Sequence, residues 1–285
     1  MVSISIAEKQ YKIYTIADEM SNSQIEVVPE RGAIITGWQV QGREILYLDE
    51  ERFANPALSI RGGIPILFPI CGNLPNNIYT YKGNQYILKQ HGFARDLPWE
   101  IDLSTEWPTL SLSSNHHTKA IYPFDFQLVF TYKIQQNVLE IHQEYKNLGY
   151  EPMPFSAGFH PYFLITNKSR LELDIPAQTY QNQITKETLP FNGVFDFDMS
   201  EIDFVFKDIS SHSITTTDYD RKFKLTLDSS YIFSTLVFWT VKNKYYYCLE
   251  PWTAPRNAIN TGEKLTILEP GTSCKSNIKL TANFF

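Results

Sequence analysis

Strand-like runs follow one another along almost the whole chain, and scarcely any stretch has the period of an amphipathic helix. Alternating segments such as FDFQLVFTYKI and VLEIHQEYKN are separated by short polar turns, which is typical of antiparallel hairpins. Roughly seventeen to twenty such runs are present, and no linker, composition break or internal repeat divides them. We therefore predict an all-β protein, with a single large β-sandwich domain over residues 1–285.

Two early segments do not fit a strand pattern. The stretch from Asp49 to Leu58 lacks a full apolar period, so we assign it to a loop. The next segment, SIRGGIPILFPICGNLP, has two prolines four residues apart, which exclude a regular helix and a central strand, and a glycine pair that allows close backbone approach. We expect a rigid, mostly apolar wall that begins at Arg61, whose charge has either a structural or a binding role.

The aromatic content is the most informative part of the composition. At 285 residues and 43% hydrophobic content the chain can bury a sizeable core. Aromatic residues make up 14% of the chain, and they favour strands and also form platforms for flat-faced ligands such as sugars and bases.

Charge and cysteine usage limit the partners and the compartment. The formal net charge is −6 without a basic run, which argues against nucleic acid and against a membrane surface as partners and favours a small molecule. Cys71, Cys248 and Cys274 are far apart and form no CxxC, so neither a disulfide framework nor a zinc site is indicated. Because the N-terminus alternates and carries charge, we predict no export or membrane signal and a cytoplasmic protein. No partner-seeking stripe is evident, so we expect a monomer.

The segment AGFHPYF carries the most conspicuous histidine. Pro161 pushes His160 toward extended backbone and interrupts the hydrogen-bond ladder of a central strand. The pattern predicts an exposed sheet edge or strand end at which His160 is presented rather than buried. Its role is either that of a hydrogen-bonded histidine at the rim of the core or that of a catalytic or ligand-binding group.

Other histidines differ in their setting. His91 and Arg95 follow the predicted hairpin YTYKGNQYIL on one loop, where a β scaffold commonly displays binding residues. Taken alone, His91 is also compatible with a structural role. His116 and His117 lie in a polar segment that we interpret as a surface loop, and His142 falls on the solvent-facing side of a strand.

Two carboxylates have candidate functions. Glu250 closes an apolar strand and is followed at once by Pro251 and Trp252, neighbours that desolvate it and hold it still. An acidic cluster lies in a predicted loop after Pro190, where Asp203 stands out because apolar residues flank it. The cluster consists of Asp196, Asp198, Glu201 and Asp203.

Two histidines, a desolvated carboxylate, two arginines and a tryptophan on the loops of a sandwich suit general acid and base chemistry on a polyhydroxy ligand. The chain has no GxSxG motif and no cysteine beside an obvious base, which disfavours a serine or cysteine hydrolase. Glycine-rich phosphate loops and dinucleotide fingerprints are also absent, so we infer no nucleotide cofactor.

Four motifs carry a family resemblance. In chain order they are IRGGIPILFPICGNL, QHGFARDLPWE, GFHPYF and CLEPWTAPRNA. Together they resemble the aldose 1-epimerase (galactose mutarotase-like) superfamily, nearest the hexose-6-phosphate epimerase branch and its bacterial relatives. The resemblance implies the β-supersandwich of the galactose mutarotase type, in agreement with the strand pattern.

The resemblance also implies roles for single residues. Glu250 would be the base that takes the proton of the anomeric hydroxyl, and His160 the acid that protonates the ring oxygen. His91 would hydrogen-bond near the ring oxygen, and Asp203 would hold sugar hydroxyls. A histidine with a pKa near 6.5 can donate and accept a proton at neutral pH, and no metal or organic cofactor is required.

The substrate is less well defined by the motifs. Arg61 and Arg95 match the arginines of the sugar-phosphate branch, where guanidinium groups bind phosphate. The stretch ILFPICGNL, however, is less aromatic than we expect for glucose-6-phosphate enzymes. Trp252 either stacks on the apolar face of the sugar or belongs to the core.

We therefore expect an isomerase that interconverts the α and β anomers of a hexose or hexose 6-phosphate. The alternative is a non-catalytic carbohydrate-binding or regulatory protein on the same fold.

Overall fold

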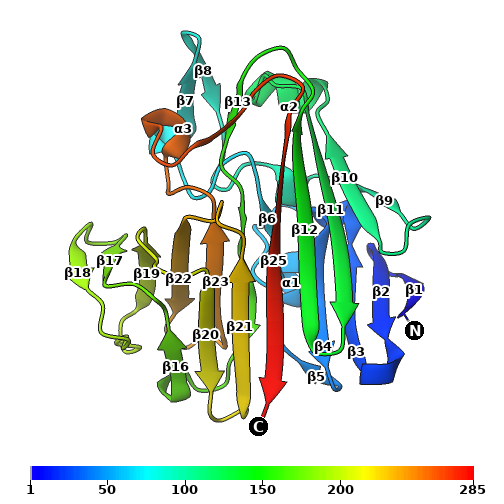
Figure 1. Cartoon of the computed structure of the whole chain (residues 1–285), viewed down its shortest axis with the longest axis vertical. Helices are drawn as coiled ribbons and strands as arrows, with labels where there is room; N and C mark the ends of the chain where they lie inside the picture. Colours follow the sequence, from blue (N-terminus) through cyan, green and yellow to red (C-terminus); the bar gives the residue numbers. More distant parts are fainter. Residues whose placement is uncertain (1) are drawn as a thin grey trace.

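Antiparallel sheets dominate the computed structural model, which describes residues 2–285 (Figure 1). The first of them, the N-terminal sheet, has the order β1-β2-β3-β4-β5. Its strands are β1 (Val2–Glu8), β2 (Lys12–Asp18), β3 (Ser23–Val28), β4 (Ile34–Val40) and β5 (Arg43–Glu44).

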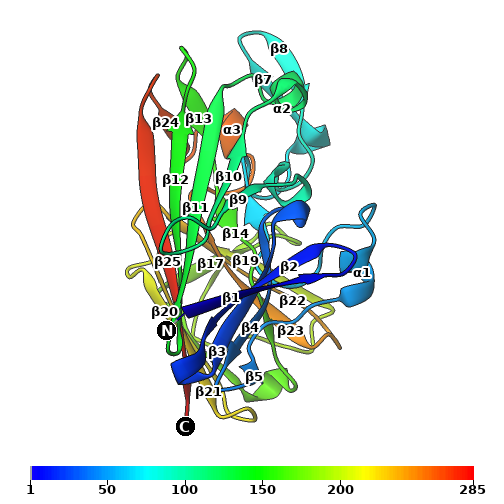
Figure 2. The ribbon, with the colours of Figure 1, turned by 90° about the vertical axis from the view of Figure 1, so that its right-hand side faces the viewer.

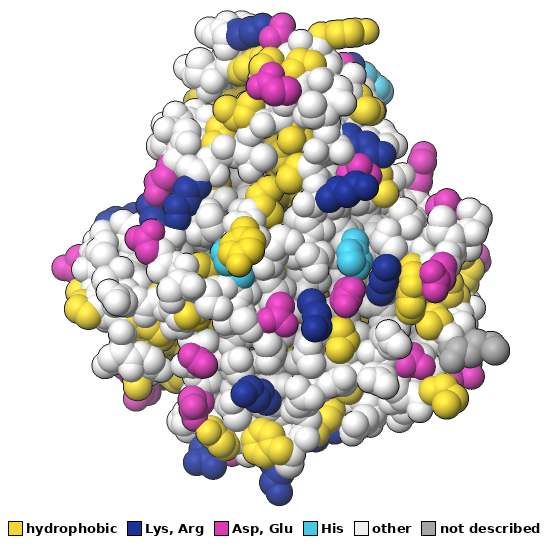
Figure 3. Space-filling view, viewed as in Figure 1, with side chains coloured by type: hydrophobic (Ala, Val, Ile, Leu, Met, Phe, Trp, Pro, Cys, Tyr) yellow, Lys and Arg dark blue, Asp and Glu magenta, His cyan; other side chains and the backbone are white. Residues whose placement is uncertain are grey.

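An eight-stranded sheet, the long sheet, has the order β16-β20-β21-β25-β12-β11-β10-β9. Its strands are β16 (Leu171–Asp174), β20 (Ser213–Asp218), β21 (Phe223–Ser229), β25 (Ser273–Phe284), β12 (Val138–Asn147), β11 (Phe126–Gln135), β10 (Thr109–Ser113) and β9 (Glu100–Asp102). Strands β12 and β11 alternate between buried and partly exposed residues over their whole length, as expected for a sheet with one face on the core. The other face carries scattered charges of both signs (Figure 3).

The other eight-stranded sheet, called here the β23 sheet, has the order β18-β17-β19-β22-β23-β14-β6, with β15 also paired to β23. Its strands are β18 (Thr188–Pro190), β17 (Thr179–Asn182), β19 (Glu201–Phe206), β22 (Thr235–Val241), β23 (Tyr246–Trp252), β14 (Gly158–Phe159), β6 (Ile66–Leu67) and β15 (Tyr162–Leu164). Figure 2 shows the long sheet at the left and strands β22 and β23 to its right, in a separate layer.

Short elements complete the chain. Two small two-stranded sheets are the hairpin of β7 (Ile78–Tyr81) with β8 (Asn84–Ile87) and the long-range pair of β13 (Met153–Phe155) with β24 (Thr266–Leu268). The helices are α1 (Glu50–Ala54), α2 (His116–Ile121) and α3 (Ala258–Thr261), and the 3-10 turns are η1 (Glu19–Ser21), η2 (Pro29–Arg31), η3 (Pro75–Asn77), η4 (Ala94–Asp96) and η5 (Lys168–Arg170). Within residues 2–285, no helix combines the length and the hydropathy that a bilayer span requires.

Aromatic side chains fill the space between the layers. One connected core cluster reaches from Ile16 to Ala282. At its centre Phe68 contacts Phe126 and Phe155 at ring-centroid distances of 5.1 and 5.6 Å. Fully burying one such ring contributes about 1.5–3 kcal/mol, so the high aromatic content of the sequence is used largely in the core.

The sheet structure confirms the all-β prediction and most of the predicted hairpins. Strands β7 and β8 flank the predicted turn at Lys82 and Gly83, and β11 and β12 flank the turn at Gln136. In the proline-rich segment 59–75 only β6 and the turn η3 are regular. Isolated bridges from Gly62 to Leu48 and from Ile64 to Ile35 confirm the close backbone approach expected at the glycine pair.

Three local predictions were wrong. The segment assigned to a loop contains α1, which begins where the Asp49 carboxylate accepts a hydrogen bond from the Arg52 amide at 3.0 Å. The two histidines assigned to a surface loop begin α2, which Asn115 and Thr118 stabilise as a capping box. Both helices have fewer than two turns, so capping rather than an apolar period determines them. Asp203 lies on the strand β19, not in a loop.

Candidate active site

One face of the β23 sheet brings the candidate residues together. Because paired residues of an antiparallel sheet point to the same side, Asp203 on β19, Trp239 on β22 and Cys248 on β23 form one row across the sheet. Glu250 lies two residues further along β23, on the same side. The intervening residues Leu249 and Phe238 belong to the opposite face, which packs into the core.

A cavity of about 290 Å³ opens on this face. Its size is near the lower limit of the roughly 300–1,000 Å³ typical of ligand pockets, which suits a small polar ligand. Every predicted site residue lines it, and so do further residues that the sequence did not single out. The lining residues are Arg52, Ser59, Ile60, Arg61, Gln90, His91, Arg95, His160, Tyr162, Glu201, Asp203, Trp239, Glu250, Trp252 and Arg256. Larger hollows lie elsewhere, among them one near the Thr166–Leu173 segment and one near β1, but neither of these two contains a buried acid and base together.

The position of His160 corrects the prediction of an exposed sheet edge. Only 8% of His160 is exposed, because β14 before it and β15 after it both pair with β23, so Pro161 interrupts a ladder inside the sheet. A side chain at Gly158 would approach the Pro251 carbonyl to 2.7 Å, so glycine permits the crossing that leads to His160. The histidine amide donates to the Pro65 carbonyl at 3.0 Å.

Glu250 and His160 form the centre of the site. The Nε2 atom of His160 lies 3.4 Å from Oε1 of Glu250, and only 1% of Glu250 is exposed. Aromatic rings hold the imidazole, since Tyr162 stacks on it at 4.7 Å and Trp239 meets it edge-on at 5.7 Å. The predicted desolvation of Glu250 is therefore present in the structure.

Burial shifts the two groups of this pair in opposite directions. Desolvation raises the pKa of the Glu250 carboxyl well above its usual value, although the charge of Arg256 opposes the shift. Desolvation lowers the pKa of His160 well below its usual value, and the charge of Arg95 adds to the effect. Both shifts disfavour charge, so the buried environment favours a neutral carboxylic acid beside a neutral imidazole.

His91 has a defined tautomer. Its Nδ1 accepts a hydrogen bond from the Gly72 amide at 3.1 Å, while its own amide donates to the Gly72 carbonyl at 2.8 Å. The ring proton must then be on Nε2, which makes His91 a hydrogen-bond donor at the cavity. Burial lowers the pKa of His91 well below its usual value and keeps the ring neutral. The backbone here is tightly constrained, because a Cβ at Gly92 would come within 2.1 Å of the Phe68 carbonyl oxygen.

Arginines supply positive charge on one side of the cavity. Arg61 donates to the Tyr246 hydroxyl at 3.3 Å and lies 5.3 Å from the centre of the Trp239 ring. Arg95 donates to the Gln90 carbonyl at 3.0 Å, and its buried Nε has no partner among residues 2–285. Neither guanidinium has a carboxylate within 4 Å in the described chain, so both remain available to an anionic ligand.

Arg256 is a site residue that the sequence reasoning missed, although it lies within the motif CLEPWTAPRNA. One of its terminal nitrogens donates to both oxygens of the Asp203 carboxylate, at 2.9 and 3.0 Å. Its guanidinium also lies 5.2 Å from the centre of the Trp252 ring, and Trp252 is fully buried. Stacking of a sugar on Trp252 stays a prediction, and Arg256 already occupies one side of that ring.

Glu201 and Trp239 were missed as well. The indole nitrogen of Trp239 donates to the Glu201 carboxylate at 2.7 Å. Glu201 was grouped with the acidic cluster of the predicted loop, but the alternation in EIDFVF puts it on the same face as Asp203. That period-two pattern was the signal in the sequence that could have assigned both residues to a strand.

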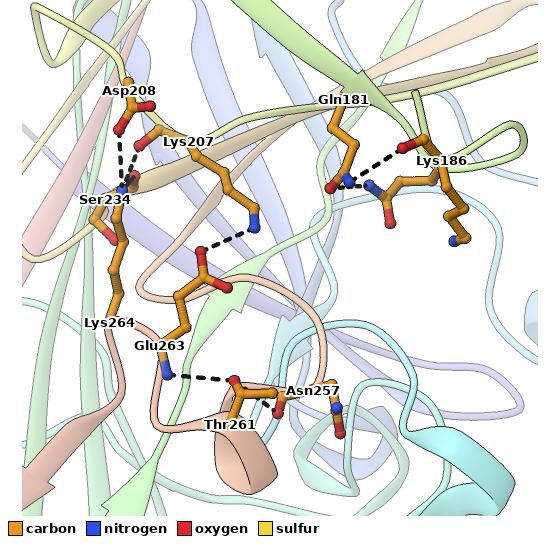
Figure 4. Close-up of polar contacts among 10 residues, drawn as sticks. Gln181, Lys186, Lys207, Asp208, Ser234, Asn257, Thr261, Glu263 and Lys264 are labelled. Carbon is orange, nitrogen blue, oxygen red and sulfur yellow. Dashed lines mark hydrogen bonds and ion pairs between the residues drawn. The ribbon is translucent and has the colours of Figure 1, made fainter. Parts of the chain in front are cut away.

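A network of polar contacts fixes the segment that follows Arg256 (Figure 4). Lys207, just after β19, pairs with Glu263 at 2.8 Å. The Glu263 amide donates to the Thr261 hydroxyl at 3.3 Å, and Lys264 donates to the Ser234 carbonyl at 3.2 Å. These contacts connect the chain around α3 to the end of β19 and to the loop before β22.

Comparisons with known proteins agree on one family. The family model for aldose 1-epimerase matches residues 12–281. The protein LacX (plasmid) of Lactococcus lactis subsp. lactis is 24% identical over 233 residues, covering 72% of this chain and 78% of the relative. A Salmonella typhimurium protein named "Putative glucose-6-phosphate 1-epimerase" is 29% identical over 178 residues, covering 59% of this chain and 55% of the relative.

Solved structures show the same fold. The Slr1438 protein of Synechocystis sp. PCC 6803 is 44% identical with a TM-score of 0.95, and the match covers 100% of both chains. The galactose 1-epimerase of Lactobacillus acidophilus NCFM is 15% identical with a TM-score of 0.78, over 100% of this chain and 99% of that one. Since the family model covers most of the sequence and the galactose mutarotase-like sandwich is present, this chain belongs to the aldose 1-epimerase family.

Proposed function

We propose that this protein interconverts the α and β anomers of a hexose or a hexose 6-phosphate by general acid and base catalysis. The observation that carries the proposal is the buried His160–Glu250 pair, 3.4 Å apart, at a polar cavity of about 290 Å³. A pure sugar binder does not need an acid and a base within reach of the same ligand atoms.

In the proposed mechanism the pair shares one proton. Glu250 takes the proton of the anomeric hydroxyl while His160 gives its proton to the ring oxygen, and the ring opens to the free aldehyde. Rotation about the C1–C2 bond and closure with the proton transfers reversed yield the other anomer. Ring opening starts from the form of the pair with the shared proton on His160, which burial disfavours relative to the neutral pair. The step leaves a neutral acid and a neutral imidazole, so the desolvation that shifts both pKa values favours it.

The surrounding residues orient the sugar. His91 offers its Nε2 proton to an acceptor such as the ring oxygen, and Asp203 accepts hydrogen bonds from sugar hydroxyls while Arg256 holds its carboxylate. Each positioned proton-transfer group typically contributes about 10²–10⁴ in rate. All of these groups belong to the chain, and the proposal involves no cofactor.

We favour a phosphorylated substrate. Arg61 and Arg95 line the cavity without carboxylate partners in residues 2–285, and guanidinium groups bind phosphate in a bidentate manner. The name of the Salmonella typhimurium relative also refers to glucose 6-phosphate. Free Cys71, Cys248 and Cys274 fit a reducing compartment, and we propose a cytoplasmic monomer.

The test is an anomerisation assay by proton NMR or polarimetry. Freshly dissolved α-glucose and α-galactose, and α-glucose 6-phosphate generated in situ, are followed with and without protein. We expect acceleration of the phosphorylated sugar above all. Acceleration of the free sugars alone would contradict the phosphate preference, and sugar binding without acceleration of any of the three would favour the non-catalytic alternative.

A substitution tests the arginine assignment. Arg61→Ala should raise KM for the phosphorylated sugar much more than for its unphosphorylated parent, because only the former loses a charge-assisted contact. Arg170→Ala is the matched control, since Arg170 pairs with Asp220 outside the cavity. Equal losses for both sugars would rule out a phosphate role for Arg61.

A further inference from the structure

Cys248 lies beside the acid–base pair, although the proposed mechanism does not use it. Its sulfur, a ring nitrogen of His160 and a carboxylate oxygen of Glu250 all lie within 4.8 Å of one another. All three residues are buried, with exposures of 0%, 8% and 1% respectively. These are three potential metal ligands at one point beside the cavity.

The β23 sheet determines this arrangement. Cys248 and Glu250 are two residues apart on β23 and therefore point to the same side. Tyr162 pairs with Cys248 across the β15–β23 ladder, which brings the preceding His160 next to both. The ligands thus come from neighbouring strands, and no short spacing such as CxxC is needed.

The distances suit a tetrahedral ion. With bonds of about 2.1 Å, two ligands of a tetrahedral zinc lie about 3.4 Å apart. The His160 Nε2 to Glu250 Oε1 distance is 3.4 Å. The Cys248 thiol lies within 4.8 Å of a ring nitrogen of His160 and of a carboxylate oxygen of Glu250, so it needs to approach by up to about 1 Å to complete a third position.

Two polar atoms of this cluster lack partners. Glu250 Oε2 and His160 Nδ1 are buried and make no hydrogen bond within residues 2–285. Buried polar atoms are nearly always paired, so these two unpaired atoms leave hydrogen-bonding or metal-binding capacity for a ligand that is not part of the chain. His160 and Glu250 also line the cavity, which provides the path of entry.

Charge determines which ion fits. Arg61, Arg95 and Arg256 surround the same cavity and oppose a cation. A thiolate from Cys248 and a carboxylate from Glu250 together neutralise a divalent ion, which removes most of the repulsion between the ion and the three arginines. A donor set of sulfur, nitrogen and oxygen is typical of zinc, and three protein ligands leave the fourth position open to the cavity.

We propose that Cys248, His160 and Glu250 form a zinc-binding site, and that bound zinc inhibits the enzyme by occupying its acid and base. Binding replaces the protons of the thiol and the carboxyl with the ion and releases them to solvent. Because zinc and sugar use the same two side chains, their binding is mutually exclusive.

The test measures binding directly and does not depend on turnover. Chelator-treated protein is titrated with Zn²⁺ by calorimetry and with Cd²⁺ by the ultraviolet charge-transfer absorption of a cadmium–thiolate bond. We expect one ion per chain. Loss of an outer-shell partner typically weakens metal binding about 10–100-fold, so removal of the thiolate in Cys248→Ala should weaken it at least about 100-fold and abolish the absorption.

Controls separate this site from other thiols. Cys71→Ala and Cys274→Ser should leave the absorption unchanged, because neither residue belongs to the cluster. Cys248→Ser serves as a second variant of similar size if the alanine variant folds poorly. Zinc should inhibit anomerisation by the wild type much more than by either Cys248 variant, each compared with its own rate without zinc. A cadmium–thiolate band that persists without Cys248, or no one-to-one binding by the wild type, would overturn the proposal.

Discussion

The long sheet and the β23 sheet use the same antiparallel pairing for different purposes. In the long sheet, β12 alternates between buried residues and partly exposed ones, and its histidine, His142, is half-exposed and paired with Glu140. In the β23 sheet every residue of β23 is buried, yet one face consists of Tyr246, Cys248, Glu250 and Trp252. Burying a carboxylate is unfavourable unless it is compensated, so the second sheet holds a reactive group at the expense of stability.

Replacing the histidine of each sheet by glutamine should give the largest difference, measured in kcat. His160→Gln removes the proposed acid and should lower kcat about 10²–10⁴-fold, equivalent to about 3–5 kcal/mol of barrier. The melting temperature should fall little, because the imidazole Nδ1 makes no hydrogen bond in the described chain. The matched control, His142→Gln, should leave kcat unchanged. A similar kcat for both variants would contradict the role of His160.

A core substitution in the long sheet should lower stability and leave catalysis unchanged. Phe130→Ala on β11 removes a fully buried ring and should lower the free energy of unfolding by about 3–5 kcal/mol. At low temperature the folded fraction of this variant should have the kcat of the wild type, since Phe130 is not part of the cavity. Lys133→Ala, on the outer face of the same strand, should change stability by no more than about 0.5 kcal/mol. Denaturant unfolding measures the free energy of unfolding of both variants. Equal losses in Phe130→Ala and Lys133→Ala would mean that the outer face contributes as much to stability as the core face.

Asp203→Asn tests the electrostatics of the β23 sheet. Hydrogen bonds to charged groups contribute about 1.5–3 kcal/mol, so loss of the charged acceptor that Arg256 holds toward the sugar hydroxyls should raise KM about 10–100-fold. Asp203 also raises the pKa of Glu250, so its neutralisation should lower that pKa. The pair then loses its shared proton at lower pH, and the alkaline limb of kcat/KM moves to lower pH. In Asp198→Asn, an exposed control paired with Lys242, the limb should not move.

The smallest effect concerns the stability cost of the site. Because burial raises the pKa of Glu250 in the folded state, ionisation destabilises the fold at pH values above the ordinary carboxyl pKa and not below it. Glu250→Gln should therefore raise the melting temperature more at pH 8 than at pH 4. The exposed Glu269→Gln should cause no such difference. A gain that is equal at both pH values would show that ionisation of Glu250 is not the cause.

Several features were predictable from the sequence because they are local. Period-two alternation predicts the hairpins and the outward side of His142, and the residues around Glu250 predict its desolvation. Prolines and glycines in residues 59–75 predict an irregular wall that approaches other backbone closely. The four ordered motifs indicate the family, which the family model confirms.

Other features depend on pairing between distant strands. The burial of His160 follows from β14 and β15 both joining β23, and the Arg256–Asp203 pair follows from the β19–β22–β23 order. The position of Cys248 beside the acid–base pair has the same origin. Alternation along a strand determines which residues share a face, but the register between strands decides which side chains meet. That register is set by the packing of the whole sandwich, which is why only the tertiary structure could assemble the site.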